Sequence, residues 1–301
     1  MKENKEAYEQ FVREITDAVK SVAGTEWSVT SRKERKNNSV ILDGMILQRG
    51  QERVAPNVYL NHYFSRYCAG ESVERLAEQI LELCDEKKSE MKVLEEKLDF
   101  SLEYICEHLY FRLVSRERNE ALLQEVPFTR YLDLALVYYW VVYEDGEQLG
   151  SIMITRNQME RLGLTVEELE RLAKQNTPKL FPAATKKMEE VVGKLLPQID
   201  YPVFVLSNEK GINGATCLIY PGVTEELQEK MQGSFFVLPS SIHELIIIPY
   251  RSATLEQLCE MVYCINRTQV PEEDILSDTV YYYDAEAKVL QIGQQEEKKG
   301  A

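Results

Sequence analysis

The sequence predicts an α+β protein made of antiparallel β-hairpins that are each followed by helices, arranged in two to three lobes. Three observations support this class. A pattern of two strands and a helix occurs twice in succession within residues 201–266, capping-box motifs open several of the helix patterns, and hydrophobic residues make up 44% of the chain. A chain of 301 residues with this composition can bury a sizeable core.

In the first of the two patterns, strands at residues 201–207 and 215–220 flank Asn213-Gly214, and a helix begins at Thr224. Asn-Gly between two apolar runs is a strong hairpin signal, because both turn residues must take positive φ. We therefore expect a hairpin here.

In the second pattern, strands at residues 234–238 and 244–249 flank Pro239-Ser240-Ser241. The helix that follows begins at Thr254, and Gln257 completes a capping box with this threonine. Such a box satisfies N–H groups that a helix start leaves without partners.

The N-terminal lobe, residues 1–98, is expected to contain a helix, a three-stranded meander and a second helix. Apolar residues three or four apart predict the first helix over residues 3–22. The charged segment 86–96 either continues the second helix or connects two lobes. The meander strands and the second helix are predicted at residues 27–35, 39–47, 54–60 and 73–84.

The middle lobe, residues 99–199, begins with a predicted strand at 108–114 and a short helix at 118–125. Strands at 131–143 and 148–155 then form a hairpin around Asp145-Gly146.

Two helices of the middle lobe open with capping boxes. Thr155 is matched by Gln158, and Thr165 is matched by Glu168. We expect Asn176-Thr177-Pro178 to end the second helix, because proline cannot continue one.

The C-terminal lobe, residues 200–292, contains the two strand–strand–helix patterns and closes with a hairpin of residues 279–283 and 288–292. A polar tail, residues 293–301, follows.

The net charge of −15 disfavours a partner that is held through phosphates, such as a nucleic acid. Only Arg32–Lys36 is locally basic, and we interpret it as the solvated end of a hairpin that turns at Asn37-Asn38. A nucleic-acid-associated regulator that uses Arg32–Lys36 is the third of our functional hypotheses.

No membrane segment is expected. The longest apolar run, residues 134–143, falls short of the roughly twenty residues of a membrane-spanning helix, so it predicts a buried strand. The N-terminus lacks the apolar stretch of a signal peptide. The cysteines form no Cys-x-x-Cys pair and predict free, mostly buried thiols in a reducing, cytoplasmic compartment: Cys68, Cys84, Cys106, Cys217, Cys259 and Cys264.

No metal or other cofactor is expected either. His62, His108 and His243 lie far apart in the sequence, without the spacing of two ligands on one helix, and the cysteines lack ligand spacing.

Ser240, Ser241 and His243 are the candidates for a polar site. On an extended chain Ser241 and His243 point to the same face, so hydroxyl and imidazole could approach each other. A working nucleophile–base pair also needs a third group that holds the base, and no Gly-x-Ser-x-Gly elbow is present. We therefore interpret the segment as a serine-rich turn before a buried strand and expect no catalytic residue.

Two aromatic clusters, Tyr138–Trp140 and Tyr281–Tyr283, lie within strand patterns. Alternate rings of a strand face opposite sides of its sheet. Core packing accounts for the first cluster. For the second, near the end of the chain, we expect an interaction surface that presents Tyr281 and Tyr283, because tyrosine is frequent at interfaces.

Parts of the chain resemble two uncharacterised families. Residues 118–123, 126–127 and 132–139 are similar to a bacterial family of unknown function from Gram-positive anaerobes, and residues 54–61 and 154–177 extend the likeness over nearly the full length. Residues 153–176 and 220–248 also resemble a second family, related to a small protein of bacilli. Ser241-Ile242-His243-Glu244 departs from that family's Arg-Asp after the serine, which argues against a shared acid/base pair. The resemblances imply a cytoplasmic bacterial protein and supply no activity.

The sequence thus favours a non-catalytic binding or interaction module with an unknown protein partner. An enzyme of unrecognised, hydrolase-like type that uses His243 and carboxylates is the alternative.

Overall fold

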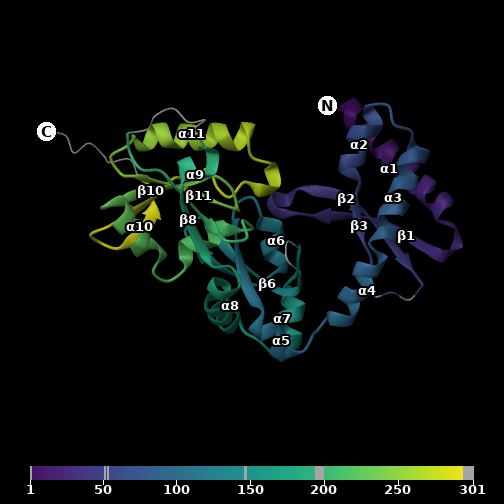
Figure 1. Cartoon of the computed structure of the whole chain (residues 1–301), viewed down its shortest axis with the longest axis horizontal. Helices are drawn as coiled ribbons and strands as arrows, with labels where there is room; N and C mark the ends of the chain where they lie inside the picture. Colours follow the sequence, from purple (N-terminus) through teal and green to yellow (C-terminus); the bar gives the residue numbers. More distant parts are fainter. Residues whose placement is uncertain (1, 51, 53, 146–147, 194–199, 294–301) are drawn as a thin grey trace. The chain divides into compact units, whose positions relative to one another are not determined.

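The computed structural model describes residues 2–50, 52, 54–145, 148–193 and 200–293. Its antiparallel sheets and separate helices make it an α+β protein, as predicted. The chain divides into two compact units (Figure 1). Unit 1 comprises Met1–Lys36 and Val40–Leu98, and unit 2 comprises Asn37–Ser39 and Asp99–Ala301.

Unit 1 has the predicted helix, meander and second helix. Its three strands pair antiparallel in the order β1-β2-β3. The charged segment forms a separate helix, α4, immediately after α3. The elements are α1 (Lys2–Ala23), β1 (Trp27–Arg35), β2 (Ile41–Arg49), β3 (Asn57–Tyr59), α2 (Leu60–Cys68), α3 (Val73–Glu86) and α4 (Lys88–Lys97), with a 3-10 turn η1 (Gly24–Glu26).

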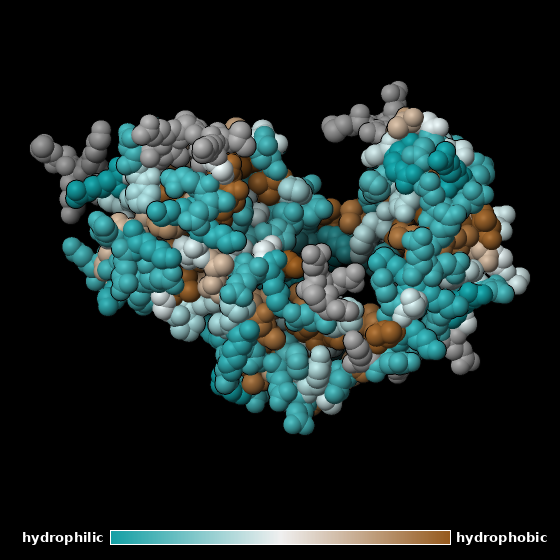
Figure 2. Space-filling view, in the orientation of Figure 1, coloured by the Kyte–Doolittle hydropathy of each residue, from teal (hydrophilic) through white to brown (hydrophobic). Residues whose placement is uncertain are grey.

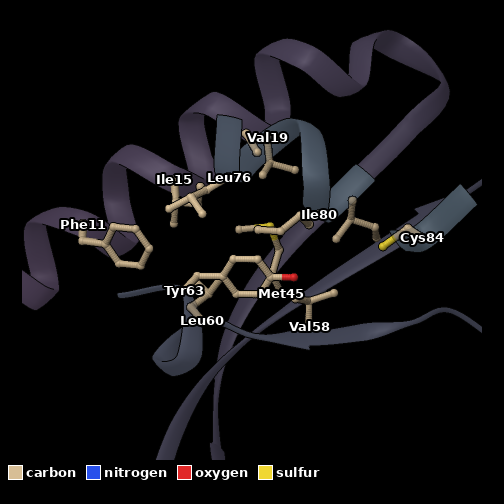
Figure 3. Close-up of a cluster of buried hydrophobic side chains, with 12 residues drawn as sticks. Phe11, Ile15, Val19, Met45, Val58, Leu60, Tyr63, Leu76, Ile80 and Cys84 are labelled. Carbon is tan, nitrogen blue, oxygen red and sulfur yellow. The ribbon is translucent and has the colours of Figure 1, made fainter. Parts of the chain in front are cut away.

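The core of unit 1 lies between the helices and the sheet. The apolar stripe of α1 meets that of α3, and Met45 of β2 and Val58 of β3 face them (Figure 3). The residues of this core with no exposed surface include Phe11, Ile15, Val19, Leu76 and Ile80.

The first sheet of unit 2 is built around one long strand, β6 (Leu134–Asp145). β4 (Leu109–Ser115), β5 (Phe128–Tyr131) and β7 (Gln148–Met153) each pair with it antiparallel. The predicted β6–β7 hairpin and buried strand are confirmed, while Gly146 of its turn lies outside the described residues. The accompanying helices are α5 (Leu102–Glu107), α6 (Glu120–Glu125), α7 (Arg156–Leu162) and α8 (Val166–Leu180).

Both capping boxes are present at the starts of α7 and α8. The prediction that α8 ends at Asn176-Thr177-Pro178 is wrong, because the helix continues through Pro178 to Leu180. Proline lacks one N–H, so only a single intrahelical bond is lost there. The N–H of Phe181 still donates to the carbonyl of Thr177, which closes the last turn.

The second sheet of unit 2 has six antiparallel strands in the order β13-β12-β10-β11-β9-β8. The structure confirms two predicted hairpins, β10–β11 and β12–β13. It also confirms the two helices predicted near Thr224 and Thr254. The elements are β8 (Ala183–Lys187), α9 (Met188–Val192), β9 (Phe204–Asn208), η4 (Gly214–Ile219), α10 (Val223–Met231), β10 (Phe235–Pro239), β11 (Leu245–Pro249), α11 (Leu255–Thr268), η5 (Glu272–Asp274), β12 (Tyr281–Asp284) and β13 (Val289–Ile292).

One predicted hairpin is wrong. Residues 214–219 form a 3-10 helix, η4, rather than a strand, and β9 pairs with β8 and β11. Asn213 does take positive φ (54°), as the Asn-Gly signal indicated. Gly214 is required for another reason. A Cβ there would lie 2.2 Å from Ser207 Oγ and 2.4 Å from the carbonyl oxygen of His243.

We expect Gly214→Ala to lower the free energy of unfolding by about 2–3 kcal/mol, because the new methyl group collides with backbone atoms that cannot rotate away. Gly211→Ala is the matched control. Unlike Gly214, Gly211 has positive φ (66°), but nothing lies within 4 Å of its Cβ position, so backbone strain alone should cost about 1 kcal/mol. Urea unfolding measures both, and equal losses would contradict the close-packing explanation.

Candidate functional site

The turn between β10 and β11 contains the serine and histidine candidates. The backbone N–H of His243 donates to Ser241 Oγ (3.0 Å), and the N–H of Ser241 donates to the carbonyl of Glu244 (3.2 Å). The Ser241 hydroxyl therefore closes the turn. The two bonds form a turn that leads into β11, and in it the Ser241 hydroxyl is a hydrogen-bond acceptor.

Both ring nitrogens of His243 have partners within unit 2. The backbone N–H of Asn213 donates to Nδ1 (3.1 Å), and Nε2 lies 3.3 Å from Asp274 Oδ1. A donor at Nδ1 forces the proton of the neutral ring onto Nε2, where it points to the carboxylate. The imidazole thus bridges the loop before η4 to η5, and it has no nitrogen left for a substrate.

Ser240 does not take part in the hydrogen bonds around His243. It lines a small, mostly apolar groove. The cavity volume is about 20 Å³, which is room for a water molecule. Its lining consists of Leu238, Pro239, Ser240, Ile246, Met261, Val262, Ile265 and Asn266.

The segment Glu272–Asp278, here called the polar strap, is the centre of a larger hydrogen-bond network. Most of it has no regular secondary structure, so its carbonyls need partners from elsewhere. Asn38 Nδ2 donates to the carbonyls of Glu272 and Ile275 (2.7 Å each). The backbone N–H of Ile242 donates to the carbonyl of Asp274 (2.8 Å).

Asn38 is itself fixed by a second asparagine. Asn119 Nδ2 donates to Asn38 Oδ1 (3.0 Å), and Asn119 Oδ1 accepts the backbone N–H of Asn38 (2.9 Å). Asn119 has no exposed surface, and Asn38 is buried with φ of 58°. The predicted hairpin does turn at Asn37-Asn38, between β1 and β2. Asn38 itself is not solvated, because it belongs to the interior of unit 2.

The last residue of the strap, Asp278, accepts hydrogen bonds from three side chains. Arg267 donates both terminal nitrogens to its carboxylate (3.0 and 3.1 Å), Arg118 Nη2 donates at 2.9 Å, and Asn266 Nδ2 at 2.8 Å. Burial alone would raise the pKa of Asp278, but these hydrogen bonds together hold its pKa below the ordinary value.

Asp133 links Tyr281 to the strap. Ser277 Oγ and Tyr281 Oη donate to the two carboxylate oxygens of Asp133 (2.7 and 2.8 Å). Burial, followed by the charge of Asp133, raises the pKa of Tyr281 well above its usual value, so the phenol stays protonated.

The prediction that Tyr281 and Tyr283 form an exposed surface is wrong, since they are 0% and 2% exposed. Tyr283 stacks on Phe235 with a ring-centroid distance of 4.8 Å. Alternation was correct, but the opposite face of the sheet is also largely buried, because Leu258 and Val262 of α11 pack on it. Tyr282 is half-buried and packs against Tyr250, which is 37% exposed (ring centroids 4.9 Å apart).

The basic run of β1 lies beside acidic and aromatic groups. Arg32 donates to Glu34 Oε1, and Lys36 contacts both Glu34 and the hydroxyl of Tyr59.

All six cysteines are free thiols, and they are less buried than expected: Cys84 and Cys217 are buried, while Cys68 and Cys264 are exposed. Burial raises the pKa of Cys84 to about 11 and of Cys217 to about 12, so neither is a thiolate at neutral pH. His62, His108 and His243 have separate surroundings. His108 stacks on Tyr104, and His62 contacts Tyr63. Within the described residues no three His, Cys, Asp or Glu side chains form a group suited to a metal ion.

Sequence reasoning missed Asn119, Asp133 and Asp278. The first two lie within the residues that carry the family resemblance, but a polar residue in a buried segment was the only local signal. Their partners are more than a hundred positions away in some cases, so no local pattern connects them. Asp133, for example, meets Ser277 and Tyr281.

These features define an α+β protein with a hydrogen-bonded polar strap and a histidine whose ring nitrogens are both engaged. None of the helices in the described part of the chain has the length and apolar character needed to cross a bilayer. The chain belongs to a family of unknown function (DUF5688), whose model matches residues 8–285. No curated protein and no solved structure matches it.

The depressed pKa of Asp278 predicts an acid-sensitive contribution to stability. The ionised form stabilises the fold fully above the pKa of an unfolded aspartate, about 4, and this contribution is lost as pH falls through the lower folded pKa. Between pH 5 and pH 3, the free energy of unfolding should therefore fall more steeply in wild type than in Asp278→Asn, which lacks the carboxylate. Urea unfolding at several pH values measures this, with the exposed Asp200→Asn as the control that keeps the wild-type slope. Identical pH slopes in wild type and Asp278→Asn would contradict it.

Proposed function

We propose that this chain is a non-catalytic binding module of a bacterial cytoplasm, with another protein as its partner. The observation that carries the proposal is an aromatic surface on the second sheet of unit 2. Its centre is the contact of Tyr250 with Tyr282, and both rings also pack on Phe236 (5.3 and 5.8 Å between centroids). Tyrosine combines a large contact area with few rotatable bonds, which favours it at interfaces.

The neighbouring strand β13 extends this surface. In the pairing register Val289 lies opposite Asp284, two residues after Tyr282, so Val289 and Tyr282 share a face. Val289 is 50% exposed. β13 ends the sheet, and within the described residues no strand pairs with its outer side. An edge strand of this kind can receive an extended segment of a partner through backbone hydrogen bonds.

On the face drawn in Figure 2, hydrophilic residues predominate and hydrophobic residues form small groups. Together with the net charge of −15, this favours a partner that recognises a limited apolar patch.

The engagement of His243 argues against nucleophilic catalysis. In a working triad one ring nitrogen meets the carboxylate and the other faces the nucleophile. Here the second nitrogen accepts the Asn213 N–H, and the Ser241 hydroxyl accepts a backbone N–H. A non-catalytic role fits this arrangement.

The binding proposal is tested by capturing partners from a lysate of the organism that makes the protein. Tyr250→Ser/Val289→Lys should lose a partner that wild type retains at stoichiometric level, because the aromatic contact and the apolar edge are both removed. Phe100→Ser/Val93→Lys is the matched control, since it changes two exposed apolar residues in other places (54% and 45% exposed). Retention of every partner by the first variant, or equal loss from both, would refute the proposed surface.

The second candidate function is a hydrolase-like enzyme that uses His243 and carboxylates. The observation in its favour is the 3.3 Å contact of His243 Nε2 with Asp274, which resembles the base-orienting half of a triad.

Two substitutions of His243 distinguish the candidates. His243→Asn retains an acceptor for the Asn213 N–H, whereas His243→Ala leaves it buried without a partner and should cost about 1–3 kcal/mol of unfolding free energy. We expect the asparagine variant to keep the fold, partner binding and whatever low background wild type shows on a panel of ester substrates. A wild-type esterase activity that disappears in the folded asparagine variant would favour the enzyme instead.

A further inference from the structure

Arg112 is a cation with no ion-pair partner among the described residues. It lies on β4, and its exposure is intermediate. Among the ion pairs of the described residues, Arg112 takes part in none, while Arg66, Arg118 and Arg267 each pair with a carboxylate. A partly buried charge with no counter-ion is costly. Within the described part of the chain, this guanidinium has no counter-ion.

The contacts of Arg112 are with neutral hydroxyls. Nε donates to Tyr110 Oη (3.0 Å), and Nη2 donates to both Tyr110 Oη and Ser151 Oγ (2.6 Å to Ser151). A guanidinium has five N–H groups. Arg112 also forms a side-chain hydrogen bond with the neutral phenol of Tyr139.

An aromatic ring fixes the plane of the guanidinium. Cζ of Arg112 lies 4.0 Å from the ring centroid of Tyr139 and 5.4 Å from that of Tyr110. Such stacking holds one face of the group while its edge remains available for hydrogen bonds.

The strand register brings these side chains to one face of the sheet. Tyr110 lies opposite Tyr139, and Ser151 lies opposite Val141, two residues further along β6. Arg112 follows Tyr110 by two residues, so it shares that face. Tyr139 and Ser151 are, like Arg112, incompletely buried.

The hydroxyls add donors of their own. Arginine has no acceptor, so Tyr110 Oη and Ser151 Oγ accept from it and keep their own protons for another group. Neither hydroxyl donates to any other described residue. Among the described residues the hydrogen-bond partners of Arg112 are thus neutral hydroxyls. Tyr110 is buried, so the incompletely buried Ser151 is the one that can turn its O–H to a ligand.

We propose that Arg112 and Ser151 bind the oxyanion group, carboxylate or phosphate, of a small ligand. The fork of an arginine matches the paired oxygens of both groups, and the Ser151 hydroxyl supplies a further donor, while the buried Tyr110 holds the guanidinium in place. This inference goes beyond the proposed protein-binding role. It concerns other residues, so either can fail without the other.

The test is a titration of the full chain with inorganic phosphate and, separately, with acetate, each at an ionic strength matched with sodium chloride. Thermal unfolding reports binding, because a ligand of the folded state raises Tm in a saturable way. We expect wild type to be stabilised by at least one anion and Arg112→Gln to bind it more weakly by about tenfold or more. The exposed Arg116→Gln is the matched control and should behave like wild type.

The outcomes divide clearly. Stabilisation by phosphate alone, acetate alone or both, lost in Arg112→Gln, supports the site and identifies the group that it takes. If Arg112→Gln does not fold, Ser151→Ala replaces it, since loss of one donor should weaken binding measurably. No stabilisation of wild type by either anion, or the same stabilisation in the Arg112 or Ser151 variant, would overturn the proposal.

Discussion

The fold of unit 2 depends on the hydrogen bonds that other segments donate to the polar strap, Glu272–Asp278. A buried backbone segment without a regular ladder must find a partner for each polar group. Here the donors come from Asn38, Ile242 and Asn266, which lie far apart in the sequence. Because β12 begins directly after the strap, these bonds also fix where the last hairpin enters the six-stranded sheet. The position of Tyr281 in the core follows from the same constraint.

The network explains why polar residues of the strap are poor candidates for chemistry. Asp278 is saturated by Arg118, Arg267 and Asn266, and His243 is held between Asn213 and Asp274. Groups whose hydrogen bonds are all satisfied within the fold make it rigid and specific, but they have little left for a ligand. Arg112 is the contrast, because its hydrogen-bond partners among the described residues are neutral hydroxyls.

Local patterns predicted much of the fold and little of the site. The capping boxes at Thr155, Thr165 and Thr254 placed three helix starts correctly, since they depend only on neighbouring residues. The Asn213 signal gave the right φ and the wrong continuation, because the apolar run after it packs as a 3-10 helix. In the Tyr281–Tyr283 strand, alternation could not reveal which face was buried. The pairing of Asn38 with Asn119 links distant segments, so no local pattern could show it.

The central claim is that both ring nitrogens of His243 form hydrogen bonds within the fold. The tautomer of this histidine tests the claim most directly. Nitrogen-15 NMR of selectively labelled histidine at neutral pH distinguishes the two ring nitrogens, and His243→Asn assigns the signals. The account predicts that the neutral ring carries its proton on Nε2, with Nδ1 unprotonated and accepting from Asn213. A ring protonated on Nδ1, with Nε2 free to act as a base, would contradict it and would favour the hydrolase.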